Sequence, residues 1–440
     1  MPQVPANLRS RFVALEVLGA ANRGGRPLDD ALRENGSFAA LEPRDRAFVR
    51  NLLATAFRRR GQIDAVLGSF LAKPLPTPDA IVGDVLQLGL AQLLFLATPA
   101  HAAVDTAVRL TEAIGRSRLK GLVNAVMRRA TREAAALVER QDAARLNTPD
   151  WLWRAWLQAY GPETTRAVAT AHLGEAPLDF TLRGAVGNWP AELAAQVLPT
   201  GSLRRLAGGA VRELPGFEPG AWWVQDAAAA LPVRLLLGSL GDAAGKRVAD
   251  LCAAPGGKTL QLAAAGATVT AVDVSAPRLA LLADNLQRTN LKAELVAADA
   301  ASWRPAGPLD AILLDAPCTA TGTIRRHPDA PWRRRPDDVT QMAALQLRLL
   351  DHAVGLLAPG AVLVYAVCSL QREEGEAQIE RLLASGAPVD LVPVAPAELP
   401  GLAEAIVPSG NLGGTVRTLP CQWGERGGLD GFFIARMRRR

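Results

Sequence analysis

With 440 residues, 49% of them hydrophobic and 21% charged, the chain has the composition of a soluble globular protein of two or three domains, not of a disordered or membrane-spanning one. Its formal net charge of +6 lies in the N-terminal third, because residues 1–140 hold 20 Lys and Arg against 13 Asp and Glu, and the other residues hold 29 against 30. The 4 cysteines include no C-x-x-C pair, so we expect no disulfide framework, no metal site and a cytoplasmic location.

Residues 1–140 carry apolar side chains at helical spacing, and strand-like runs bounded by turns are lacking. The expected helices include 45–57, 79–96, 102–114 and 118–132. The longest apolar stretch, 85–97, is too short to span a bilayer and contains two glutamines, so we expect no membrane association. This third of the chain is predicted to be an all-α domain.

Basic side chains cluster twice in this domain, at Arg58–Arg60 and again between residues 116 and 132. The second cluster consists of Arg116, Arg118, Lys120, Arg128, Arg129 and Arg132. Such clusters are typical of surfaces that bind a nucleic-acid backbone. The alternative is that they are solvated helix faces of an arginine-rich protein.

Residues 141–222 change in character. Trp151, Trp153 and Trp156 lie in a predicted helix, and Leu178–Arg183 alternates like a half-buried strand. Glycine- and proline-rich pieces follow. We expect a small mixed α/β subdomain that links the two larger domains.

Residues 223–440 alternate strand-like and helical runs, which predicts βαβ units and a mostly parallel, doubly wound α/β sheet of Rossmann-like type. The expected strands are 248–252, 268–274, 293–298, 309–315, 361–367 and 432–437. In such sheets, ligands bind beyond the carboxyl ends of the strands.

The first of these strands leads into the glycine-containing loop Asp250–Thr259. A phosphate-binding P-loop would need glycine where Cys252 stands, and the dinucleotide pattern G-x-G-x-x-G is absent. Asp273 ends the second strand, where a carboxylate can hold ribose hydroxyls, and Asp299 follows the third, within reach of an adenine. This set favours a nucleoside cofactor without a phosphate requirement, such as S-adenosylmethionine; the alternative is that the acids only cap helices.

Two cysteines stand where the next two strands end: Cys318 three residues after Asp315, and Cys368 at the end of 361–367. One possibility is that both are small buried hydrophobes. The other is nucleophilic catalysis: a thiolate that adds to cytosine C6 makes C5 able to take a methyl group, and a second group then assists release. Asp315 is placed to stabilise the adduct, and Lys258 can add a cation to the same pocket.

Four segments resemble those of RNA cytosine-5 methyltransferases: 250–259, 315–322 with 325–328, 365–369 and 430–433. The helical first domain resembles the NusB RNA-binding fold. The combination is similar to the RsmB (Sun/Fmu) family of bacterial 16S rRNA cytosine-5 methyltransferases, and the resemblance covers essentially the whole chain. It implies domains at 1–140 (NusB-like), 141–222 (mixed) and 223–440 (methyltransferase), with Gln225–Asp226 opening the last.

The resemblance also implies roles for residues. Cys368 is expected to be the nucleophile and Cys318 to help release the product, with Asp315 and Lys258 in the same catalytic set. The residues expected to line the S-adenosylmethionine site are Cys252, Ala253, Ala254, Pro255, Gly256, Gly257, Lys258, Asp273, Asp299 and Asp315. His327 could act as a general base, but we expect it rather to assist in an RNA-facing loop, where Arg325, Arg326 and Arg333–Arg335 suit phosphate contacts.

The chain departs from the family pattern in two places. Val367 replaces the usual threonine before the nucleophile, and Ala320 replaces a glycine after Cys318. If position 320 requires a positive φ, Ala320 stores strain of about 1 kcal/mol. Neither change removes a reacting group, so we expect effects on rate and substrate preference rather than on reaction type.

These inferences predict an S-adenosylmethionine-dependent RNA cytosine-5 methyltransferase that acts as a monomer on an unstacked base of 16S rRNA. One alternative is the same chemistry on tRNA, or methylation of a protein. Another is a non-catalytic NusB-like RNA-binding protein, which explains the basic first domain but leaves both cysteines and the glycine loop without a role.

Overall fold

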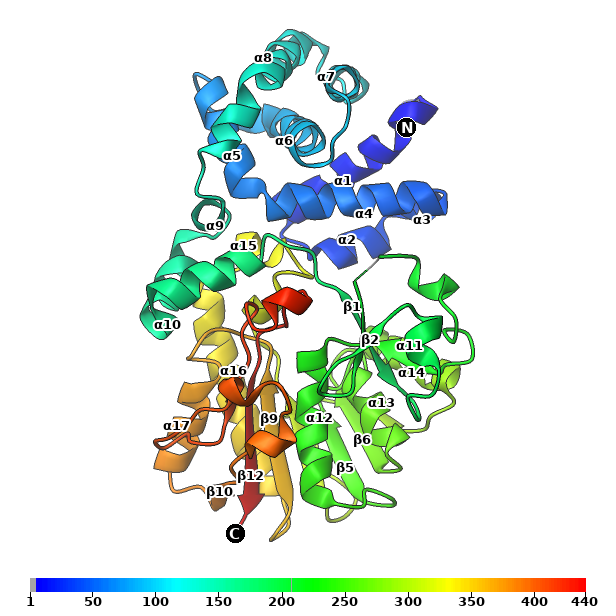
Figure 1. The fold of residues 1–440 in the computed structure, drawn as a ribbon, viewed down its shortest axis with the longest axis vertical. Coiled ribbons are helices and arrows are strands. Elements are labelled where there is room, and N and C mark those ends of the chain that lie inside the picture. Colours follow the sequence, from blue (N-terminus) through cyan, green and yellow to red (C-terminus); the bar gives the residue numbers. More distant parts are fainter. Residues whose placement is uncertain (1–4, 207) are drawn as a thin grey trace. The chain divides into compact units, whose positions relative to one another are not determined.

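The computed structural model describes residues 5–206 and 208–440 and separates the chain into two compact units (Figure 1). The helical unit consists of the described part of Met1–Gly174 together with Ile324–Arg334. The sheet unit consists of Glu175–Thr323 and Arg335–Arg440. The domain boundaries at residues 140 and 222 stay predictions. The two units meet along the chain at Gly174 instead, so residues 141–174 belong to the helical unit and residues 175–222 to the sheet unit.

The helical unit confirms the all-α prediction for the N-terminal domain. Its α-helices are α1 (Arg9–Gly24), α2 (Leu28–Glu34), α3 (Gly36–Ala39), α4 (Pro43–Arg58), α5 (Arg60–Phe70), α6 (Ala80–Phe95), α7 (Ala100–Ala113), α8 (Lys120–Glu139), α9 (Ala143–Leu146), α10 (Asp150–Ala171) and α15 (Ala330–Arg333).

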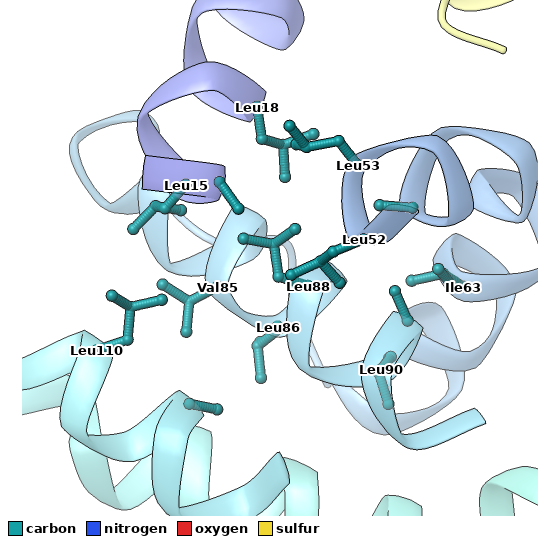
Figure 2. Packing of buried hydrophobic residues seen from close by; sticks show 14 of the residues in the cluster. Leu15, Leu18, Leu52, Leu53, Ile63, Val85, Leu86, Leu88, Leu90 and Leu110 are labelled. Carbon is teal, nitrogen blue, oxygen red and sulfur yellow. The ribbon is translucent and has the colours of Figure 1, made fainter. Parts of the chain in front are cut away.

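Helix α6 forms the centre of this unit. Leu86, Leu88 and Leu90 of α6 lie among apolar side chains of α1, α4, α5 and α7 in Figure 2. Within the described residues, Thr77–Phe95 is the one stretch long and apolar enough to cross a membrane by length and composition, and 61% of it is buried. A helix that is apolar on all sides is expected at the centre of a helical core, and this is the place that α6 takes.

A short segment from the C-terminal half of the sequence belongs to the helical unit. The indole nitrogen of Trp332 donates to the carbonyl oxygen of Phe57 at 2.9 Å, and the guanidinium of Arg60 lies 5.2 Å from the centre of the Trp332 ring. Asp329 accepts a hydrogen bond from the backbone amide of Leu28 at 3.1 Å. The chain therefore leaves the sheet unit after Thr323 and returns to it at Arg335.

The sheet unit begins with a small antiparallel sheet in the order β2-β3-β1-β4. Its strands are β1 (Leu178–Leu182), β2 (Gln196–Val197), β3 (Leu203–Arg205) and β4 (Trp222–Val224), with the short helix α11 (Trp189–Glu192) between β1 and β2. A fully buried ion pair joins Asp179 of β1 to Arg204 of β3, with 2.6 Å between Oδ2 and Nη2. Arg204 also donates to the carbonyl oxygen of Gly428 at 2.7 Å, so this pair ties the small sheet to the loop before the last strand.

The large sheet has the order β10-β12-β9-β8-β5-β6-β7, with β11 paired to β12. The five strands from β9 to β7 are parallel to their neighbours, and β12 runs antiparallel to β9. The strands are β5 (Arg247–Leu251), β6 (Thr268–Asp273), β7 (Glu294–Ala297), β8 (Ala311–Asp315), β9 (Val362–Val367), β10 (Val389–Leu391), β11 (Val416–Arg417) and β12 (Phe433–Arg439). The predicted Rossmann-like sheet is confirmed.

Helices cover both faces of this sheet (Figure 1). They are α12 (Ala227–Leu240), α13 (Gly257–Ala264), α14 (Ala276–Thr289), α16 (Pro336–Leu356) and α17 (Glu376–Ala384). Alternate residues of β9 join opposite cores: Val364 packs in the core that contains α12, and Tyr365 in the core that contains α16 and α17. Because both faces are buried, the strands are continuously apolar, which is the pattern seen in the sequence.

Candidate active site

The two predicted catalytic cysteines lie side by side at the carboxyl edge of the sheet. Strands β8 and β9 are parallel neighbours, with Asp315 opposite Ala366, so the segments that follow them start at the same level. The Sγ atoms of Cys318 and Cys368 are 3.4 Å apart, within hydrogen-bonding distance for sulfur. Both thiols are partly buried rather than sealed in the core.

The thiol of Cys318 resists ionisation. Its hydrogen bond with Cys368 and its burial raise its pKa well above the usual value, and the charges of Cys368 and Glu374 act in the same direction. Cys318 is therefore a protonated thiol at neutral pH. A protonated thiol at this distance can donate a hydrogen bond to the Cys368 sulfur.

Lys258 and Asp315 form a charged pair beside the thiols. The Lys258 Nζ lies 2.7 Å from Asp315 Oδ2, and the two side chains are 11% and 29% exposed. Although burial opposes it, the charges of Asp315 and Cys368 raise the pKa of Lys258 above its ordinary value. Lys258 is therefore a permanent ammonium, and its charge acts on both Asp315 and Cys368. The ring of Phe432, 5.3 Å from Nζ, covers it.

The glycine loop turns sharply between β5 and α13. Cys252 has a φ of 64° and Gly256 a φ of 108°. A Cβ atom at Gly256 would lie 2.1 Å from a methyl carbon of Leu282, so both the conformation and the space require glycine there. Burial raises the pKa of the Cys252 thiol well above its usual range, so this cysteine stays protonated and is not a nucleophile.

Asp273, at the end of β6, is turned toward the glycine loop. Its side chain is buried, Oδ2 accepts from the amide of Ala254 at 3.0 Å and Oδ1 from the amide of Ser275 at 2.9 Å. A carboxylate oxygen has two lone pairs, so each can accept a further hydrogen bond, as the two hydroxyls of a ribose require. These residues fit a nucleoside cofactor.

Asp299 is placed differently from the other predicted cofactor residues. It is exposed, and its Oδ1 accepts from the amide of Ala301 at 2.9 Å in its own turn. The structure thus brings together Cys318, Cys368, Lys258 and Asp315, and Lys258 joins this group to the glycine loop that contacts Asp273. Among the hydrogen bonds of the described residues, the side chain of Asp299 makes only this local one.

The segment with His327 lies in the helical unit. His327 Nδ1 is 3.1 Å from Asp29 Oδ2, and this hydrogen bond, before any other cause, lowers the pKa of Asp29. Of the basic clusters, Arg118 lies 2.6 Å from the carboxylate of Asp79 and Arg129 lies 2.8 Å from Glu133. Part of the basic excess therefore serves ion pairs within this unit.

The two departures from the family pattern have different surroundings. Val367 is fully buried in the core formed with α16 and α17, where a hydroxyl would need a partner. Ala320 adopts a φ of 58°, so the strain of about 1 kcal/mol expected for a non-glycine residue in this region applies.

Two buried acids escaped the sequence reasoning. Glu374 accepts hydrogen bonds from residues next to both cysteines, and Asp250, at the start of the glycine loop, has a pKa raised to about 7 by burial, against the hydrogen bond from Thr259. Asp250 Oδ1 has no hydrogen-bond partner in the described structure. By residue type alone, Glu373–Glu374 is indistinguishable from a solvated acidic pair before a helix, and only the fold shows that Glu374 is buried.

Comparison with known proteins agrees with this architecture. The family described as 16S rRNA methyltransferase RsmB/F matches residues 239–438, and the NusB family matches residues 8–132. The ribosomal RNA small subunit methyltransferase B of Xanthomonas campestris pathovar campestris is 38% identical, over 86% of this chain and 88% of its own. The protein of the same name from Pseudomonas syringae pathovar tomato is 37% identical, over 98% of this chain and 97% of its own.

Solved structures share the fold. The crystal structure of PH0851 superposes with a TM-score of 0.75 at 23% identity and covers 99% of both chains. A methyltransferase homolog protein from Pyrococcus horikoshii has a TM-score of 0.52 at 28% identity and covers 65% of this chain and 94% of its own. Fold and site together define an S-adenosylmethionine-dependent methyltransferase with a NusB-like domain. Within that class, the chain belongs to the RsmB family.

Proposed function

We propose that this protein transfers a methyl group from S-adenosylmethionine to C5 of a cytosine in 16S rRNA, through a covalent bond between Cys368 and C6 of the base. Its curated relatives are named as small subunit ribosomal RNA methyltransferases, which supports both the substrate and a cytoplasmic location. The observation that carries the reaction type is the pair of thiols 3.4 Å apart. Methylation of an exocyclic amine needs no thiol, whereas C5 chemistry needs one to activate the ring and uses a second group for release.

Cys368 starts the reaction. Its thiolate sulfur bonds to C6, and the electron pair of the C5–C6 double bond moves into the ring toward N3. Asp315 accepts a hydrogen bond from the exocyclic amine, and the Lys258 ammonium, bonded to Asp315 at 2.7 Å, stabilises the added negative charge. The ring is then an enamine whose C5 is nucleophilic.

When bound, S-adenosylmethionine supplies an electrophilic methyl group. The residues that would hold it are the loop 252–258 with Asp273, Asp299 and Asp315. Asp273 would bind the ribose, since its carboxylate is buried at the loop and has lone pairs free for two hydroxyls.

Cys318 completes the reaction. C5 must lose its proton, after which the C5–C6 double bond re-forms, the bond from C6 to sulfur breaks and Cys368 leaves as a thiolate. The hydrogen bond with Cys368 is the largest cause that raises the pKa of Cys318, and the charge of Cys368 adds to it. Both vanish once the Cys368 sulfur is bonded to C6, so Cys318 ionises more readily at this stage. The Cys318 thiol first loses its proton to solvent, and the resulting thiolate accepts the proton from C5.

The test is methyl transfer to 16S RNA by the wild type, Cys368→Ala and Cys318→Ala, analysed on denaturing gels with labelled cofactor. We expect transfer by the wild type, none by Cys368→Ala, and a slowly migrating protein–RNA adduct with Cys318→Ala. Activity of Cys368→Ala close to wild type would contradict the mechanism. Transfer to tRNA but not to 16S RNA would contradict the substrate alone, and cofactor-independent RNA binding without any transfer would favour the non-catalytic alternative.

A further inference from the structure

Glu374 is a buried carboxylate that the mechanism above does not use. It lies between β9 and α17, and its residue is 0% exposed. Oε1 accepts from the backbone amide of Thr319 at 2.8 Å and from Gln346 Nε2 at 3.2 Å. Oε2 accepts from the hydroxyls of Thr319 and Ser369. Four donors therefore converge on one carboxylate.

Further hydroxyl contacts surround these hydrogen bonds. Thr321 Oγ1 accepts from the amide of Leu370 at 2.9 Å and lies 3.1 Å from Ser369 Oγ, where either hydroxyl can donate. Ser369 Oγ also accepts from the amide of Gln371 at 3.1 Å and lies 3.2 Å from Thr319 Oγ1. An ionised Glu374 can accept from all four of its donors, because a carboxylate offers only acceptor atoms. Burial raises the pKa of Glu374, and the hydrogen bonds from Ser369 and Thr319 oppose that shift.

The residues that Glu374 binds are the immediate neighbours of the two thiols. Thr319 follows Cys318 and Ser369 follows Cys368, and the amide of Gly322 donates to the carbonyl oxygen of Cys368 at 3.0 Å. We propose that Glu374 is a positioning residue, which holds the segments after β8 and β9 together and thereby sets the spacing of the thiol pair. The proposal rests on the proposed function for the purpose of that spacing, but the spacing itself can be measured without RNA.

Phenylarsine oxide probes the pair directly. The arsenical binds two adjacent thiols to form two As–S bonds and releases one water, so no net proton or electron is exchanged and its affinity reports geometry. We expect Glu374→Gln to raise the dissociation constant for the arsenical about tenfold, which corresponds to the loss of one charge-assisted hydrogen bond. Glu373→Gln, an equal charge change at the exposed neighbouring residue, keeps the wild-type value. Cys318→Ala and Cys368→Ala give the value for a single thiol.

A second variant guards against misfolding of Glu374→Gln. Thr319→Val removes one donor with little change of shape, so it should weaken arsenical binding in the same direction but less. In the Glu374→Gln background, Thr319→Val should raise the dissociation constant for the arsenical hardly any further, because both changes remove the same interaction.

The kinetic arm separates positioning from general damage. We expect Glu374→Gln to lower kcat for methyl transfer by about ten- to hundredfold, with KM for RNA and the dissociation constant of the cofactor within about twofold of wild type. Wild-type arsenical affinity in Glu374→Gln would overturn the proposal, whether or not kcat falls. If the wild type transfers no methyl group, the proposed function fails, and the arsenical comparison still decides the role of Glu374.

Discussion

Lys258→Gln removes the ammonium that connects the cofactor loop to the catalytic carboxylate. Glutamine keeps the length of the side chain to within one bond and retains a hydrogen-bond donor, so the change mainly removes charge. The pKa of Lys258 is raised by Asp315 and Cys368 against the effect of burial, so the wild-type side chain stays charged across the neutral range. The variant therefore differs from the wild type by one positive charge at every pH used in an assay.

The expected size of the effect follows from the geometry. The pair at 2.7 Å is largely withdrawn from water, at 11% and 29% exposure, so it falls among charge-assisted hydrogen bonds worth about 1.5–3 kcal/mol. If that interaction supports the negative charge that develops on the ring, kcat falls by about ten- to hundredfold. The fold should be little affected, because Asp315 is exposed enough to be hydrated when its partner is lost.

Single-turnover methyl transfer, with cofactor affinity measured by calorimetry, tests this prediction. Lys246→Gln is the matched control, since Lys246 pairs with Asp310 at 3.2 Å with side chains 43% and 37% exposed. That exposed pair should contribute little, and the control should stay within about twofold of wild type. A Lys258→Gln enzyme that binds cofactor and turns over at the wild-type rate would refute the role given to the ammonium.

Three further predictions concern the sheet unit. Burial raises the pKa of Asp250 to about 7, so the stability that this group contributes is complete below the ordinary carboxyl pKa and is lost as pH rises through 7. Between about pH 5 and about pH 8, Asp250→Asn should therefore lose less free energy of unfolding than the wild type, as measured by urea denaturation. Equal losses in the two proteins would contradict this prediction. Gly256→Ala should weaken cofactor binding at least about tenfold, because φ is 108° and the new Cβ atom would lie 2.1 Å from a carbon of Leu282. Gly257→Ala is the control, since its Cβ atom would have no neighbour nearer than 3.5 Å, and it should bind the cofactor like the wild type when both variants are measured by calorimetry. Asp179→Asn breaks a fully buried ion pair and leaves Arg204 unpaired, so chemical denaturation should show a loss of about 3–5 kcal/mol, and a loss below about 1 kcal/mol would be the contrary result.

Local sequence pattern was enough to predict the large sheet and the meeting of the thiols. Strands β8 and β9 are apolar on both faces, and residues at the carboxyl ends of adjacent parallel strands must lie at one edge of the sheet. Cys318 and Cys368 are therefore predicted to lie together, and the structure brings their sulfurs to 3.4 Å.

The remaining features depend on tertiary packing that leaves no periodic signal. Segment 324–334 reads as a polar loop of the catalytic domain, but Trp332 and Asp329 bind the backbone of the helical unit. Arg118 reads as a ligand for phosphate, yet it pairs with Asp79, 39 positions earlier in the sequence. Glu374 has an exposed glutamate before it, and nothing in residue type distinguishes the buried one.

The most direct test of the account is to map the covalent adduct. Cys318→Ala would be incubated with 16S RNA and S-adenosylmethionine, digested with protease and nuclease, and analysed by tandem mass spectrometry. The account predicts a methylated cytidine nucleotide attached to the peptide that contains Cys368. Attachment to any other residue, or no adduct from a variant whose wild-type parent makes 5-methylcytidine, would contradict it.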